Sequence, residues 1–200
     1  MWAPDGLFRV TNPTPGTGIA QSIVTAFAAV SPLVTLFNGN AAGGASIYPD
    51  YIKLICAAAG ASSTSGQLAA VLDTVDRYTS GGSLLTPVNA NMKSTVASGA
   101  VVHFGAIVAA AATAARLTGR DTIKTQAAPC WVVGDEIFIK FGNTDNTFGP
   151  TNGAAPNLYP APCGQVVVAP QSSLLVYLWN PANAATPPSW ELEMGYFERS

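Results

Sequence analysis

The chain of 200 residues has the length of one domain, and β-sandwiches of this size commonly fold as a single unit. Hydrophobic residues make up 48% of it and charged residues only 10%, against a usual charged fraction of about 25%, which excludes a disordered chain. The formal net charge is −2 and the basic residues are scattered along the sequence. No stripe of cations is therefore available for phosphates, and nucleic acid is not an expected partner.

Residues 1–18 are rich in proline and glycine and predict an irregular N-terminal arm, followed by a single β-sandwich domain over residues 19–200. Trp2 lies on this arm and is a candidate anchor between subunits, because buried tryptophans often carry interface energy. The first residues lack a basic stretch followed by an apolar one, so we expect no signal peptide and synthesis in a cytoplasm.

Strand patterns begin in the next segment. Residues 19–37 contain two apolar runs rich in Val, Ile, Thr and Phe, which favour strands. In residues 51–58, Ile52, Leu54 and Cys56 fall on one face and Tyr51, Lys53 and Ile55 on the other, so that one face is mostly apolar. This alternation predicts a strand with one face toward the core.

The middle of the chain is less clear. Residues 67–78 fit both a helical stripe and a strand, and their neighbours favour the strand; residues 79–82 predict a turn. Residues 98–117 are long and apolar enough to span a membrane, but alanine rather than leucine dominates and His103 interrupts the run. We therefore expect strands within residues 99–113 and no membrane partner.

The second half predicts further strands. The clearest lies in residues 131–141, and residues 165–169 and 173–179 follow it. The last residues alternate as well, with inward positions at Trp190, Leu192, Met194 and Tyr196. The whole pattern is typical of an all-β protein, a single jelly-roll-like β-sandwich of about eight strands.

Residues 142–164 are rich in glycine, proline and asparagine and predict a long loop. Loops of more than about 15 residues are uncommon in compact domains and usually carry function or reach a partner. Phe148 and Tyr159 lie on it and are candidates for contact with a partner or ligand.

The sequence lacks the residues that the common catalytic and metal-binding sites require. His103 is the only histidine, and no G-x-S-x-G turn accompanies it. Cys56, Cys130 and Cys163 are far apart and form no C-x-x-C pair, so zinc lacks ligands. Reduced cysteines are the simpler interpretation, with a Cys130–Cys163 bridge left open. We expect no enzyme and no cofactor.

Three segments carry a resemblance to a known family: VDRYTSGGSLLTPVNANMKS at 75–94, VGDEIFIKFG at 133–142 and PPSWELEMGYFERS at 187–200. Together with the charge-poor composition, they resemble small jelly-roll proteins of tailed bacteriophage particles, in particular capsid decoration (cement) proteins. The resemblance implies a structural virion protein that binds the major capsid protein on the capsid surface as a homotrimer. The alternative is a carbohydrate- or receptor-binding jelly-roll module of a phage tail or fibre, since one fold serves both uses.

Overall fold

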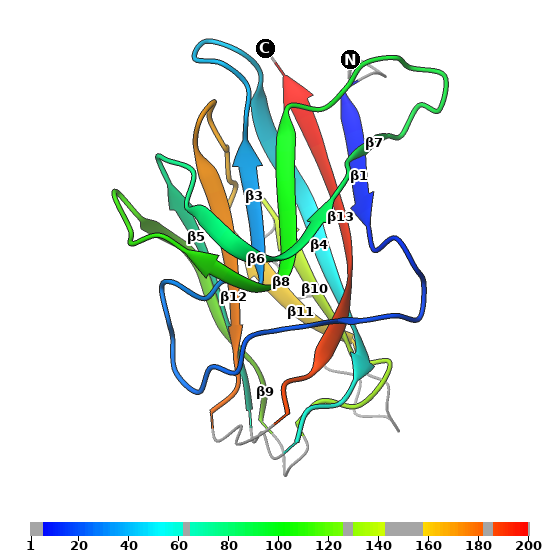
Figure 1. Cartoon of the computed structure of the whole chain (residues 1–200), viewed down its shortest axis with the longest axis vertical. Helices are drawn as coiled ribbons and strands as arrows, with labels where there is room; N and C mark the ends of the chain where they lie inside the picture. The colour runs from blue at the N-terminus through cyan, green and yellow to red at the C-terminus, as the bar shows by residue number, and fades with distance from the viewer. Residues whose placement is uncertain (1–5, 62–64, 126–129, 143–157, 182–185, 200) are drawn as a thin grey trace.

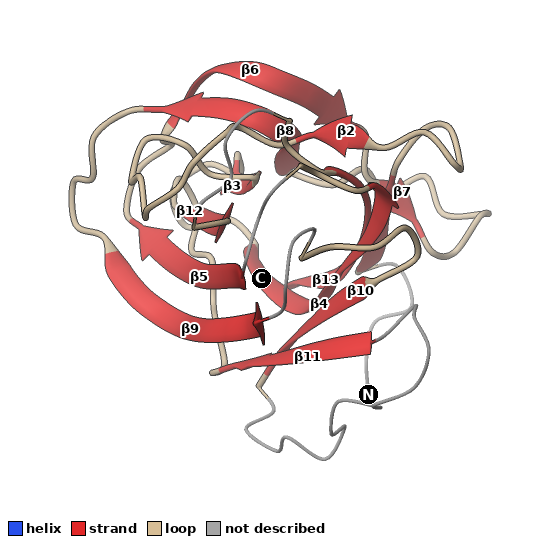
Figure 2. Cartoon of the chain, turned by 90° about the horizontal axis from the view of Figure 1, so that it is seen from below, coloured by secondary structure: helices blue, strands red, loops and turns tan. Residues whose placement is uncertain are grey.

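A computed structural model of the chain describes residues 6–61, 65–125, 130–142, 158–181 and 186–199. Over these ranges the strands pack as two sheets face to face (Figure 1), and the chain forms no α-helix (Figure 2). The first sheet has the order β11 (Leu158–Cys163), β10 (Glu136–Phe141), β4 (Ser46–Ala58), β13 (Ser189–Arg199), β1 (Leu7–Thr11) and β7 (Val88–Asn89), with β2 (Ile19–Ala20) paired to β13. The second has the order β6 (Tyr78–Leu85), β8 (Ala100–Ala109), β3 (Val34–Asn38), β12 (Ser173–Trp179), β5 (Ser65–Asp73) and β9 (Arg116–Thr125).

The pairing of the strands is that of a jelly roll. Eight strands, β1, β3, β4, β5, β9, β10, β12 and β13, form four nested antiparallel pairs. In chain order, the first of them pairs with the eighth, the second with the seventh, the third with the sixth and the fourth with the fifth. An antiparallel ribbon folded over itself into two sheets gives this nesting. The predicted jelly-roll-like β-sandwich is therefore confirmed, and the remaining strands are additions to it.

The core lies between the two sheets and follows the predicted alternation. Ile52, Leu54 and Cys56 of β4 are buried, as are the four predicted inward positions of β13. The rings of Trp131 and Trp190 meet edge to face in this core, with centroids 4.9 Å apart. Burying large aromatic side chains contributes strongly to the stability of such a core.

Two expectations for the first half are corrected. The range expected as an irregular arm contains β1, because Phe8 and Val10 alternate inward and are fully buried. The turn expected at residues 79–82 lies inside β6. Gly81 and Gly82 have φ of +77° and +65° and lie at register shifts against β8, so they mark bulges in an edge strand.

Two expectations for the second half are also corrected. The loop expected over residues 142–164 contains β11, which pairs in parallel with β10. Its prolines are tolerated because β11 is an edge strand, with one side free of ladder hydrogen bonds. The strand expected at residues 165–169 is reduced to one isolated bridge between Val168 and Ile47.

The apolar stretch at residues 98–117 forms β8 and the start of β9 instead of a helix. Among the described residues, no helix is long and apolar enough to cross a membrane.

Gly105 in β8 marks a close approach between strands. Its φ is +115°, and a Cβ there would lie 2.4 Å from Cγ2 of Ile19. We expect Gly105→Ala to lower the free energy of unfolding by more than about 1 kcal/mol, measured by urea denaturation. Gly43→Ala is the matched control, since Gly43 has φ +83° and open space around it. Equal costs for the two variants would show that the contact with Ile19 does not matter.

Candidate functional site

Of the three residues expected at an interface, the structure describes only one. Trp2 and Phe148 lie outside the described residues. Tyr159 lies on β11 and is only 8% exposed. Its ring meets the ring of Trp131 edge to face, with centroids 5.9 Å apart. Tyr159 is thus a core residue of this chain and not the surface contact expected from its place in a loop.

The residues with catalytic potential are paired or buried. His103 stacks on Tyr78 with ring centroids 3.5 Å apart, and burial lowers the pKa of His103 despite the opposing charge of Asp76. No disulfide joins the three cysteines, all of which are buried. Burial, followed by the charge of Asp121, raises the pKa of Cys163 to about 11, which keeps this thiol protonated near neutral pH. The described residues contain no group of three or more His, Cys, Asp or Glu able to hold a metal ion.

Residues 78–99, which we call the edge insertion, run from the edge of the second sheet at β6 to the edge of the first sheet at β7 and on to β8 (Figure 1). Large apolar side chains are exposed along it. Met92 is the extreme case, with 97% of its surface exposed. The others are Leu84, Val88 and Val96.

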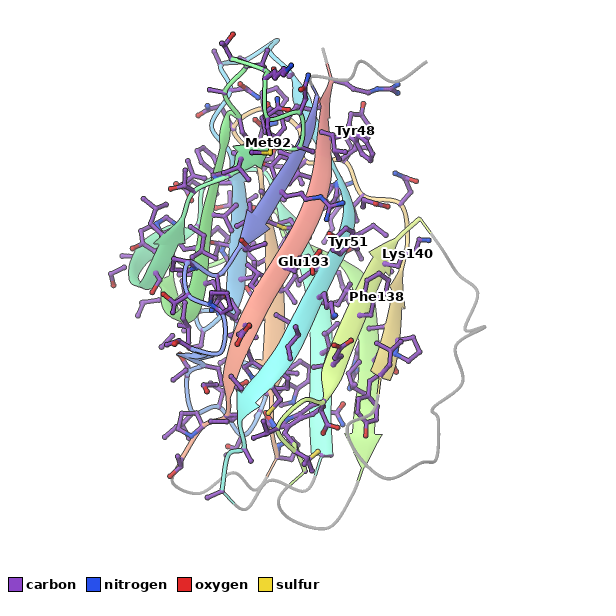
Figure 3. The ribbon with its side chains drawn as sticks, turned by 90° about the vertical axis from the view of Figure 1, so that its right-hand side faces the viewer. Tyr48, Tyr51, Met92, Phe138, Lys140 and Glu193 are labelled. Carbon is purple, nitrogen blue, oxygen red and sulfur yellow. The ribbon has the colours of Figure 1, made fainter. Side chains whose placement is uncertain are left out.

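The tip of the edge insertion is held by local hydrogen bonds. The backbone N–H groups of Asn91 and Lys93 donate to Oδ1 of Asn89 and Asn91 at 2.9 and 3.2 Å. The N–H of Ala90 donates to the carbonyl of Leu7 at 2.9 Å, which ties the tip to β1. Such Asx turns fix a loop without secondary structure. Met92 is therefore presented outward from an ordered turn, near the upper end of the molecule in Figure 3.

A second feature, which we call the apolar cleft, lies on the outer face of the second sheet and holds about 420 Å³. Phe27, Tyr177, Trp179 and Leu117 line it together with four alanines and a valine. Phe27 comes from the segment between β2 and β3, and its ring lies 4.9 Å from that of Tyr177 and 5.7 Å from that of Trp179. The cleft is thus walled by aromatic rings on a floor of small side chains.

A bulge in β9 shapes this cleft. Leu117 and Arg120 are three residues apart, a spacing that places side chains on opposite faces of a regular strand. Here the register shifts, so that Leu117 lies opposite Val71 and Arg120 opposite Ala69. Val71 and Ala69 share the outer face of β5. The bulge therefore brings Leu117 and Arg120 to the same face, where both line the cleft.

The buried side chain of Arg77 holds the segments around the cleft in place. Its side chain is 1% exposed and lies 3.6 Å from the carboxylate of Asp73. Nε and Nη2 donate to the carbonyl of Ala110 at 3.0 and 2.6 Å, and Nη2 also donates to that of Ala29 at 2.7 Å. The hydroxyl of Tyr177 donates to the same Ala29 carbonyl at 2.9 Å. These contacts tie two loops to the sheet and give the cleft fixed walls.

The outer face of the first sheet carries a paired set of aromatic and charged groups. Tyr51 and Phe138 stack with centroids 5.6 Å apart, and the Tyr51 hydroxyl donates to Glu193 at 2.6 Å (Figure 3). Arg9 donates to that hydroxyl at 3.2 Å. Burial, followed by Glu193, raises the pKa of Tyr51 to about 12. The polar atoms of these groups are thus paired with one another on a mixed aromatic and charged surface.

The sequence alone did not single out the residues that form these surfaces. Met92 follows two asparagines suited to turns, and that spacing was the available signal for an exposed residue. Nothing in the sequence indicated that Arg120 and Leu117 share one face, because the bulge that places them there depends on the register of β5 against β9.

Comparisons of the chain with protein-family models, curated proteins and solved structures found no match. The strand order therefore defines the class on its own: a jelly-roll β-sandwich. Structural and ligand-binding proteins share this class, so the function has to be argued from the surfaces described above.

Proposed function

We propose that the chain is a non-enzymatic structural protein of a bacteriophage particle, which binds the major capsid protein and stabilises the shell as a decoration protein. One observation carries the proposal: the edge insertion presents exposed apolar side chains, led by Met92, from a hydrogen-bonded frame. Single exposed apolar residues are common on protein surfaces, but several on one ordered segment are what a contact surface for another protein requires. The charge-poor composition supports it, since neutral faces lose little on desolvation.

The proposal includes a homotrimer on the capsid surface. A symmetric assembly repeats each weak contact, so modest surfaces together hold a subunit firmly on a shell. We expect light scattering to give three times the chain mass of 20.5 kDa, independent of concentration. A stable monomer at all concentrations would contradict this part of the proposal.

The Met92 contact has a direct test. The purified chain is sedimented with empty shells assembled from the major capsid protein of the same genome, and we expect saturable binding. Met92→Asp should weaken binding at least tenfold, as expected for the loss of a central apolar contact. Val133→Asp is the matched control, because Val133 is also exposed but lies outside the edge insertion. Equal binding by both variants would exclude the edge insertion as the contact.

The alternative, a carbohydrate- or receptor-binding module, relied on Phe148 and Tyr159. Burial of Tyr159 removes one of these two residues from any exposed site. The stacked pair of Tyr51 and Phe138 is the described feature that favours glycan binding, because sugars pack on aromatic rings. Binding on a glycan array that is lost in Phe138→Ala would support the alternative, and no binding would count against it.

A further inference from the structure

We propose that the apolar cleft binds a small amphiphilic anion, meaning an aromatic or aliphatic body that carries one carboxylate or sulfonate. This inference goes beyond the contact with a shell and does not depend on it, because the cleft and the edge insertion are formed by different residues.

The aromatic side chains that line the cleft determine the apolar part of the ligand. Tyr177 and Trp179 are nearly buried under Phe27, which remains half exposed at the mouth. A volume of about 420 Å³ lies within the range of small-molecule sites, which are concave and mostly apolar with few polar groups. Ala112 and Ala115, also in the lining, keep that volume open because their side chains are small.

The anionic part of the ligand is specified by the guanidinium group of Arg120. Arg77 and Arg120 both line the cleft, and no carboxylate does so among the described residues. The donors of Arg77 are directed at Ala29, Ala110 and Asp73. The side chain of Arg120 is exposed and, in the described part of the chain, forms no hydrogen bond or ion pair, whereas its backbone pairs with β5. Its planar guanidinium therefore remains able to bind a carboxylate with two hydrogen bonds.

The position of Arg120 supports the same inference. A β-bulge re-aims a side chain at a local cost in ladder hydrogen bonds, and bulges often occur beside binding sites. In β9 the bulge brings Arg120 to the face of the sheet where the aromatic side chains of the cleft lie, and its side chain has no ion-pair partner among the described residues. An amphiphilic anion satisfies both features of this surface at once.

The test uses three probes of one shape: 1-naphthoate, neutral 1-naphthylmethanol and cationic 1-naphthylmethylammonium. Binding to the full chain is measured by calorimetry and by the change in tryptophan fluorescence, since Trp179 lines the cleft. We expect naphthoate to bind about tenfold more tightly than the alcohol, the effect of one charged hydrogen bond. The ammonium should bind more weakly still. Equal affinities for the three probes, or no binding of naphthoate, would overturn the proposal.

Three variants assign the binding to this cleft. Arg120→Gln should remove the preference for naphthoate over the alcohol, whereas Arg116→Gln, an exposed arginine of the same strand outside the lining, should keep it. Ala115→Trp should fill the cleft and abolish binding of every probe. Thermal unfolding checks that each variant is folded. Equal effects of the two arginine variants, or unchanged binding in Ala115→Trp, would place the probe elsewhere and contradict the inference.

Discussion

Replacement of Arg77 by alanine is expected to lower the free energy of unfolding by about 3–5 kcal/mol, because removing one partner of a buried ion pair leaves the other charge uncompensated. Arg77 is 1% exposed and lies 3.6 Å from Asp73. Its loss also removes the side-chain donors to the carbonyl of Ala110 and leaves the carbonyl of Ala29 with the Tyr177 hydroxyl alone. Urea denaturation followed by circular dichroism measures the change. Arg120→Ala is the matched control, as an exposed arginine of the same cleft, and should change the stability by no more than about 0.5 kcal/mol.

The pH dependence of stability tests the same pair. Burial alone raises the pKa of Asp73, but backbone N–H groups of Ala114, Thr113 and Thr74 and the charge of Arg77 outweigh it, so the pKa lies below its ordinary value of 3.8. Because the folded pKa is the lower one, the carboxylate stabilises the fold fully above pH about 4, and this contribution is lost as the pH falls through the folded pKa. Asp73→Asn should flatten the acid limb of the stability curve. An unchanged acid limb would show that Asp73 does not contribute.

Replacement of Trp190 by alanine is expected to cost about 3–5 kcal/mol, the usual effect of removing a large buried aromatic side chain. Trp190 is fully buried, and its ring meets the ring of Trp131 edge to face. Its Nε1 donates to Oε1 of Gln21 at 2.8 Å, and Nε2 of Gln21 donates to Oδ1 of Asn180 at 3.1 Å. The tryptophan therefore joins the core to the segment that leads from β2 toward the apolar cleft.

A conservative variant separates packing from hydrogen bonding at Trp190. Trp190→Phe retains most of the aromatic contact but leaves the Gln21 oxygen without its buried donor, which costs about 1–3 kcal/mol. Both variants are compared with the natural chain by urea denaturation. A cost below about 1 kcal/mol for Trp190→Ala would contradict the placement of this residue at the centre of the core.

Strands were predicted most accurately where apolar and polar residues alternate along the chain. The inward positions Ile52, Leu54 and Cys56 of β4 and the four inward positions of β13 were predicted residue by residue, whereas the first five residues of β4 were not predicted as strand. Prediction was poorer where glycine or proline lies inside a strand. Gly81 and Gly82 resemble a turn when read locally, yet they form bulges in β6, and the prolines of β11 are tolerated at a sheet edge. Edges and bulges depend on the partner strand, which local sequence does not specify.

The candidate surfaces were harder to predict than the fold. Tyr159 was expected on a surface because its neighbours resemble a loop, but β11 turns it toward Trp131. The apolar cleft joins residues from β5, β9 and β12 with Phe27 from a distant segment. No periodicity links these positions along the chain. Only the order and register of the second sheet bring them together.

The central proposal is most directly tested by imaging. Shells of the major capsid protein are reconstructed by electron cryo-microscopy with and without the added chain. We expect extra density on the outer surface that fits the jelly roll as a trimer, with the edge insertion and Met92 against the shell. Bare shells at saturating protein, or density that meets the shell through another face while the edge insertion points to solvent, would contradict it.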